Sequence, residues 1–95
     1  MDINDFEKEF TEMFGFLLSQ EFAKEAPKDT GTLARSFPAT FQLIDDVSLE
    51  WDVPFYFEFV EFGTVKQKPN PFVRRTLENK SEEIAQRVVD ILEKQ

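Results

Sequence analysis

Two glutamates, Glu58 and Glu61, stand three residues apart among phenylalanines and are the residues best spaced for acid–base chemistry. At that spacing they would share one face of a helix, and burial is how enzymes keep a carboxylic acid protonated for use as a general acid. The alternative is two solvated or ion-paired carboxylates on the polar side of a short helix. The chain has no histidine, the commonest acid–base residue, so the sequence favours this second interpretation.

Another group of carboxylates lies in a predicted hairpin and could attract a cation. Its members are Asp45, Asp46, Glu50 and Asp52. They lack the ligand spacing of a calcium-binding loop, and a solvated hairpin is the simpler interpretation. No metal site is therefore predicted there.

Nucleophilic and phosphate-binding chemistry finds little support either. Ser36 and Thr30 have no base in sequence with the spacing that activates a nucleophile. The three glycines, Gly15, Gly31 and Gly63, are too far apart to form a glycine-rich phosphate loop. The chain has no cysteine, which excludes thiolate nucleophiles, thiolate metal sites and disulfides. We expect no catalytic residue, no metal and no cofactor.

Composition restricts the partners that the chain could bind. Its 95 residues are the size of one domain, which we predict to span residues 1–95. It carries 19 acidic and 11 basic residues, for a net charge of -8. That negative charge argues against binding nucleic acid through the electrostatic field of the whole molecule, and against docking on anionic membranes. No apolar run is long enough to span a bilayer, and the acidic N-terminus is unlike a signal peptide, so a cytosolic protein is expected.

Phenylalanine is the unusual feature of the composition. The chain has 12 phenylalanines, against one tyrosine and one tryptophan. Each ring adds a large apolar area with no polar group. A core of two helices and two strands should need fewer rings, so we expect some to be buried only between subunits.

The elements that must position these residues begin and end with helices. Apolar residues recur at three- and four-residue spacing over residues 4–25 and again over 71–94, which predicts an amphipathic helix in each. Asn70 is expected to cap the last helix, with Pro71 in its first turn. The inward face of that helix is expected to hold Phe72, Leu77, Ile84, Val88 and Ile91.

The segment between the helices is predicted to turn and then form a hairpin. Residues 27–37 carry turn and cap formers followed by apolar residues four apart, which predicts a turn and a short helix. Apolar and polar residues alternate over 38–53, which predicts two half-buried strands joined at Asp45 and Asp46. Pro38 is expected at the start or edge of its strand, because it donates no ladder hydrogen bond.

The phenylalanine-rich segment that begins at Pro54 fits two structures. Its rings alternate as in a strand, yet Phe55, Phe59 and Phe62 also recur as on a helix. Pro54 suits a first helical position, and Gly63 suits the residue just past a helix end. The local pattern leaves both structures open, and we favour a short helix.

Charge is unevenly distributed over the second half of the chain. Residues 45–62 hold six acids and no base, whereas residues 66–75 hold four bases and no acid. Ordinary surface variation is one explanation. The other is a head-to-tail interface in which the basic loop of one copy meets the acidic hairpin of the next, an arrangement that closes into rings. The candidate interface residues are Asp45, Asp46, Glu50, Asp52, Lys66, Lys68, Arg74 and Arg75.

Three stretches, in this order, carry a resemblance to a known family. They are residues 26–37 (APKDTGTLARSF), 56–64 (YFEFVEFGT) and 69–74 (PNPFVR). Together they resemble the head–tail joining or tail-completion proteins of long-tailed bacteriophages, the "gene product ten" type of lambdoid phages. The residues that carry the match are Pro27, Asp29, Thr30, Gly31, Leu33, Ser36, Tyr56, Glu61, Phe62, Gly63, Thr64, Pro71 and Phe72.

The resemblance implies an α+β fold, in which a long N-terminal helix and a C-terminal helix pack on a small antiparallel sheet. It implies that Gly31 and Gly63 take bends that side chains disfavour, and that Thr30 caps a helix. It also implies that Glu61 bonds to nearby backbone or to Arg35. No catalytic residue comes with the family.

The function that the resemblance implies is structural and non-enzymatic. Such a protein forms a ring of its own copies, in similar proteins usually a hexamer, and contacts the connector or tail tube of a phage or prophage particle. Its place is the neck or tail of the virion, after assembly in the host cytoplasm. The alternative is a small acidic protein-binding module, an antitoxin-like protein or a DNA-mimic inhibitor, which leaves the three stretches unexplained.

Overall fold

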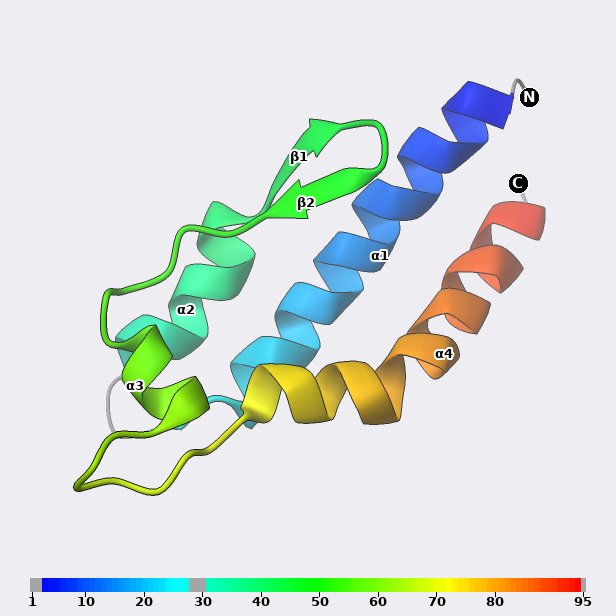
Figure 1. Ribbon diagram of the computed structural model, residues 1–95. Coiled ribbons are helices and arrows are strands. Elements are labelled where there is room, and N and C mark those ends of the chain that lie inside the picture. The colour runs from blue at the N-terminus through cyan, green and yellow to red at the C-terminus, as the bar shows by residue number, and fades with distance from the viewer. Residues whose placement is uncertain (1–2, 28–30, 95) are drawn as a thin grey trace.

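The computed structural model describes residues 3–27 and 31–94. The α+β fold predicted from the sequence is confirmed: the described part of the chain holds a long N-terminal helix, two short helices, one antiparallel hairpin and a long C-terminal helix (Figure 1). The elements in chain order are α1 (Ile3–Glu25), α2 (Gly31–Thr40), β1 (Gln42–Asp45), β2 (Ser48–Glu50), α3 (Phe57–Phe62) and α4 (Phe72–Glu93).

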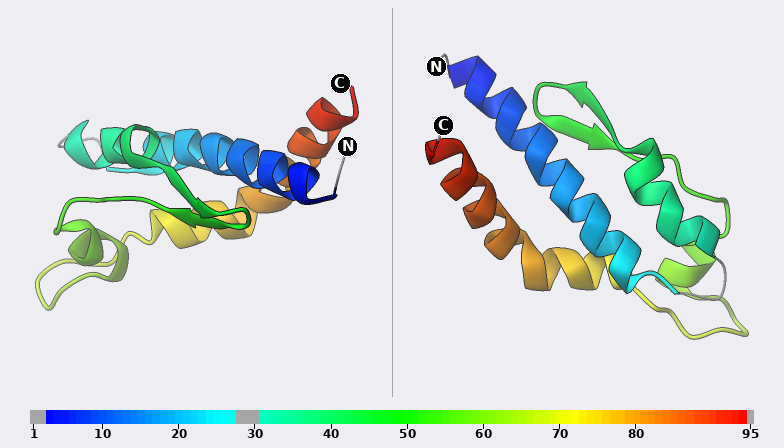
Figure 2. Two further views of the ribbon diagram at one scale, coloured as in Figure 1. Left: turned by 90° about the horizontal axis from the view of Figure 1, so that it is seen from above. Right: turned by 180° about the vertical axis from the view of Figure 1, so that it is seen from behind.

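Helix α1 is the centre of the arrangement. It packs against α2 and the hairpin on one side and against α4 on the other (Figures 1 and 2). Helix α4 bends in its middle, so that its second half runs beside the first half of α1. The molecule is elongated, with extents of 51 × 23 × 19 Å. The two ends of the chain lie at one end of it, and α3 with the following loop lies at the other.

A cluster of edge-to-face aromatic rings joins the elements in the core. The Phe37 ring lies 5.2 Å from Phe22, 6.3 Å from Phe57 and 5.8 Å from Phe72, centroid to centroid. Trp51 adds a further edge contact to Phe22 at 5.6 Å. These rings come from every layer of the fold, and edge-to-face pairs add to the free energy of area burial. We call Phe22, Phe37, Trp51, Phe57 and Phe72 the buried ring cluster.

The hairpin rests directly on the backbone of α1. A Cβ atom at Gly15 would lie 2.5 Å from Cε2 of Phe41 and 2.7 Å from Cδ2 of Leu49. Trp51 Nε1 donates to the Ser19 hydroxyl at 2.8 Å, and that hydroxyl donates to the Gly15 carbonyl at 2.7 Å. The glycine therefore makes room for the apolar face of the hairpin, and a buried hydrogen-bonded chain fixes the strand end to α1.

The strand predicted over residues 38–53 is partly wrong. Residues up to Thr40 continue α2, with Pro38 inside the helix, and the strands are limited to Gln42–Asp45 and Ser48–Glu50. Leu33 and Phe37, four residues apart, are both buried on one face of α2. Ala39, which the predicted alternation would turn inward with Phe37, is exposed, so the burial at the end of α2 does not follow the period of two that a strand requires.

Helix α4 buries a different stripe from the predicted one. Phe72, Ile84 and Val88 are buried as predicted, but Leu77 and Ile91 are exposed. Thr76 and Leu92 take the inward positions instead. The buried residues stand at multiples of four along the helix, so the stripe follows the rows that pack against α1.

The prediction of a short helix in the phenylalanine-rich segment is confirmed as α3. Pro54 precedes the helix, and its carbonyl accepts the N–H of Phe57 at 3.0 Å, so its expected place in the first turn is wrong. Gly63 follows the helix with φ of 79°, a left-handed backbone that favours glycine. Gly31, by contrast, begins α2 without a positive φ, so the strained bend expected there is wrong.

Candidate functional site

Glu61 joins two helices and is not part of an acid–base pair. Its side chain is buried, with 5% of the residue exposed. Its carboxylate accepts the backbone N–H of Val73 at 3.1 Å and of Arg74 at 3.0 Å. These are free donors of the first turn of α4, where the helix dipole favours a negative charge. Glu58 is exposed on the same helix, whereas both carboxylate oxygens of Glu61 accept backbone N–H groups of α4.

The prediction that Asn70 caps the last helix is wrong, because the Glu61 carboxylate accepts the free N–H groups at the start of α4. The Asn70 side-chain oxygen accepts a hydrogen bond from Arg75 Nη2 at 3.0 Å, and its backbone N–H donates to the Val60 carbonyl at 2.7 Å. The residue at the helix start is Pro71, which makes no side-chain cap. The chain after α3 is thus fastened to α3 itself, which fixes where the intervening loop projects.

The other residues of the three sequence stretches lie in structural positions. Leu33 is buried, and the Ser36 hydroxyl donates to the Leu33 carbonyl at 2.6 Å. Phe72 is fully buried, and Pro71 stands just before it. Pro27 and Tyr56 are half-buried. The positions expected to cap and turn before α2, Asp29 and Thr30, lie outside the described residues.

Gly63 and the residues after it form a fixed loop. A Cβ atom at Gly63 would lie 2.8 Å from the Pro69 nitrogen and 2.9 Å from the Gln67 carbonyl oxygen. Thr64 and Gln67 exchange backbone hydrogen bonds of 2.9 and 3.3 Å across the turn. The Thr64 hydroxyl accepts the N–H of Lys66 at 3.2 Å. The loop therefore folds back on its own base, and its tip is held away from the body of the molecule.

Exposed aromatic and basic side chains gather around this loop. Phe55 is 85% exposed and Phe62 is 74% exposed. Phe59 is exposed beside Phe55, with centroids 6.5 Å apart. Val65, at the loop tip, is fully exposed. We call this region the basic aromatic end, and its residues are Phe55, Phe59, Phe62, Val65, Lys66 and Lys68.

Arg74 and Arg75 lie beside the basic aromatic end, in the first turns of α4. Both are exposed. Arg74 makes only a long contact to Glu78, at 3.9 Å, and such exposed pairs contribute little. The four basic residues singled out in the sequence are therefore close together in the chain and all face solvent.

The acidic hairpin lies toward the opposite end of the molecule (Figures 1 and 2). Its carboxylates Asp45, Asp46, Glu50 and Asp52 are all exposed. The N–H of Val47 donates to Asp45 Oδ1 at 2.9 Å, and this bond, with a further one from Ser48, holds the pKa of the Asp45 carboxyl below its usual value. The turn of the hairpin thus points away from the end of the molecule that holds α3 and the basic loop (Figure 1).

A groove on α1 was not found from the sequence. It has a volume of about 360 Å³. It is lined by Glu9, Glu12, Met13, Phe16, Phe41 and Leu92. Phe41 comes from the base of the hairpin and Leu92 from the end of α4, so only the tertiary arrangement creates the groove. The sole sequence signal is Phe16, an aromatic residue outside the inward stripe of its helix.

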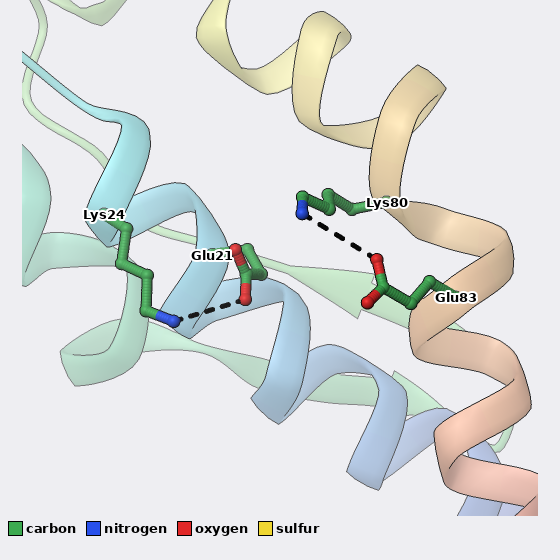
Figure 3. Close-up of polar contacts among 4 residues, drawn as sticks. All are labelled: Glu21, Lys24, Lys80 and Glu83. Atoms are coloured by element: carbon green, nitrogen blue, oxygen red, sulfur yellow. Dashed lines mark hydrogen bonds and ion pairs between the residues drawn. The ribbon is translucent and has the colours of Figure 1, made fainter.

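The remaining polar contacts of the helices are ordinary surface pairs. Lys24 lies 3.4 Å from Glu21 on α1, and Lys80 lies 3.8 Å from Glu83 on α4 (Figure 3). Each pair stays within its own helix. Among residues 3–27 and 31–94, no group of three acidic residues could hold a metal ion. None of the described helices is both long and apolar enough to cross a bilayer.

Comparison with known proteins adds no relative. The sequence matches no protein-family model, and no curated protein and no solved structure is significantly similar to it. The site must therefore be interpreted from its own geometry, which offers two chemically different surfaces at opposite ends of an elongated molecule.

Proposed function

We propose that this chain is a non-enzymatic structural protein of a phage or prophage, a ring-forming subunit that acts in head–tail joining or tail completion. The resemblance of three sequence stretches supports the phage assignment. The observation that carries the assembly part is the set of aromatic side chains that the folded chain leaves in solvent, next to unpaired basic residues.

The exposed rings support assembly because a single folded chain gains nothing from them. Phe55 and Phe62 expose most of their surface at one end of the molecule. Phe55 also contacts the exposed Phe59, with ring centroids 6.5 Å apart, and neighbouring exposed apolar side chains of this kind are typical of an interaction site. Aromatic residues are also enriched in interface centres, and the basic residues in the loop that follows them suit an acidic partner.

The separation of charge supports a partner that is another copy. The basic residues Lys66 and Lys68 lie at one end, and the acidic hairpin lies toward the other. Two different surfaces on one chain give a heterologous contact, which propagates until a ring closes or a filament grows. A ring around the axis of a phage neck is such a closed assembly.

Light scattering after size-exclusion chromatography tests the proposal. We expect a species of defined mass, several times the 11.2 kDa of one chain, that weakens as salt screens the charges. A monomer at every soluble concentration and at low salt would count against a ring-forming subunit. Genes for portal, capsid and tail-tube proteins beside this gene would support the phage assignment independently.

A small acidic binding module is the second candidate. The net charge of -8 favours it, because such a charge attracts a basic partner. Capture of one defined basic protein, in a complex of fixed stoichiometry and without self-association, would favour this candidate over the first. It accounts for the charge and for the exposed aromatic side chains, but it leaves the Thr-Gly-x-Leu and Glu-Phe-Gly-Thr stretches unexplained.

A further inference from the structure

The tip of the basic loop has the form of a rigid projection. Val65 stands at the tip, fully exposed, between Thr64 and Lys66. The paired backbone bonds between Thr64 and Gln67 hold the turn in one conformation. A side chain presented in this way loses little conformational freedom on binding, and that preorganisation favours association.

The groove on α1 has the complementary chemistry. Met13, Phe16 and Phe41 give it an apolar floor, and Glu9 and Glu12 give it carboxylates. Its volume of about 360 Å³ can take an aliphatic side chain with part of a neighbouring one. Both glutamates are exposed, and neither is engaged in any of the ion pairs found in the described part of the chain.

We propose that Val65 of one copy inserts into the α1 groove of a second copy, where Lys66 and Lys68 pair with Glu9 and Glu12. The inference rests on the proposed self-assembly and names the surfaces that carry it. It names a different acidic partner from the hairpin carboxylates expected from the sequence, because Glu9 and Glu12 line an apolar groove.

The geometry makes this contact intermolecular. The loop projects from the α3 end of a molecule 51 Å long, whereas the groove lies on α1 toward the end that holds both termini (Figures 1 and 2). A chain therefore cannot fill its own groove, and each copy offers one projection and one groove. This is the arrangement that links identical subunits head to tail.

Further apolar surface lies ready to extend the contact. Phe62 is exposed just before the loop. A second apolar hollow, lined in part by Phe6, Phe10 and Val47, lies toward the same end of the molecule as the groove.

Charge reversal on each side tests the pairing. One variant carries Lys66→Glu with Lys68→Glu, and the other carries Glu9→Lys with Glu12→Lys. We expect each alone to self-associate at least about tenfold more weakly than the wild type in sedimentation velocity, because each turns an opposite-charge contact into a like-charge one. Mixed in equal amounts, the two variants should recover association, because both junctions in an alternating assembly are again complementary.

The outcomes separate this inference from the proposed function. If either reversed variant associates as strongly as the wild type, the pairing of loop and groove is wrong while self-assembly stands. If only the groove variant loses association, the groove has another occupant. Unaltered circular dichroism spectra and thermal transitions of both variants serve as the folding control.

If the wild-type chain associates too weakly for sedimentation velocity to detect, disulfide cross-linking tests the proposed contact. The wild-type chain has no cysteine, so Val65→Cys and Phe16→Cys chains each carry a single thiol, and mass spectrometry of the oxidised mixture separates mixed dimers from dimers of one variant. We expect covalent dimers of the two chains in clear excess over a matched control in which Glu78→Cys, exposed on α4, replaces the groove variant. Equal yields from the two mixtures would overturn the inference even if the wild type is monomeric.

Discussion

Two groups of phenylalanines, one in the core and one in solvent, meet at α3. On one side of that helix, Phe57 lies 6.3 Å from Phe37 and 6.0 Å from Phe72, within the buried ring cluster. On the other side, Phe55 and Phe62 lie in solvent. Phenylalanines in and just before this short helix therefore divide between the core and the exposed surface. The core packs without the outer rings, and we propose that another copy covers them.

Two fixed points hold α3 between the groups. Glu61 ties it to the first turn of α4, and Gly63 turns the chain into the basic loop. The exposed rings are thereby presented by an anchored element and not by a free loop. Removing a ring of the inner group should strongly destabilise the fold. Removing Glu61 or Gly63 should weaken the contacts that hold α3 in place. Removing the rings of the outer group should leave the monomer as stable as before.

Phe72→Ala should have the largest effect on stability. The ring is 0% exposed and contacts two other rings edge to face. Its loss leaves a cavity, and we expect a cost of about 3–5 kcal/mol in the free energy of unfolding. Urea unfolding followed by circular dichroism measures it. A cost below about 1 kcal/mol would contradict the placement of this ring at the centre of the core.

Glu61→Ala should come next. Two backbone donors at the start of α4 lose a charged acceptor, and we expect a cost of about 1.5–3 kcal/mol. Hydrogen exchange of the Val73 and Arg74 amides should accelerate at the same time. The matched control is Glu58→Ala, an exposed carboxylate on the same helix, which should change neither measurement. Equal effects of the two variants would refute the anchoring role.

Gly63→Ala should cost about 1–3 kcal/mol, because φ of 79° with ψ of 177° is a backbone conformation that only glycine adopts readily. The added Cβ would also press on Pro69 and Gln67. Gly31→Ala is the control, since that glycine has no positive φ and would meet only the flexible end of Arg35. Thermal unfolding compares the two. A Gly31 variant as unstable as the Gly63 variant would contradict this distinction.

Phe62→Ala should have the smallest effect on the isolated chain. With 74% of the residue exposed, little area is lost from the core, and we expect a change within about 0.5 kcal/mol. The urea midpoint is measured at a dilution where the chain is monomeric. A cost near that of Phe72→Ala would show that the outer ring belongs to the fold, and the contrast between the two groups would fail.

The spacing of apolar residues along the chain was enough to predict the helices whose inward residues recur at regular intervals. Helices α1 and α4 follow from their long apolar stripes, and α3 follows from ring spacing with Gly63 at its end. The boundary at Thr40 was missed because alternation over a few residues fits a strand and a helix face alike. Pro38 increased that error, since the exposed last turns of α2 accommodate it.

The candidate site was less predictable, because tertiary contacts create it. The capping carboxylate of α4 comes from Glu61, and the near neighbour Asn70 has the better local signature. The α1 groove requires Phe41 and Leu92 to reach the same face of α1, which no spacing along the chain indicates. The basic loop was visible as a charge run, but the projection of Val65 depends on the turn that Gly63 makes possible.

The most direct test of the central claim compares self-association with and without the outer rings. Sedimentation velocity over a concentration series should show the mass of the wild-type chain rising above 11.2 kDa. The Phe55→Ala/Phe62→Ala variant, folded and equally stable, should remain at that mass throughout. Equal association of the two chains, or monomers at every concentration for both, would contradict the claim that the exposed rings join one copy to the next.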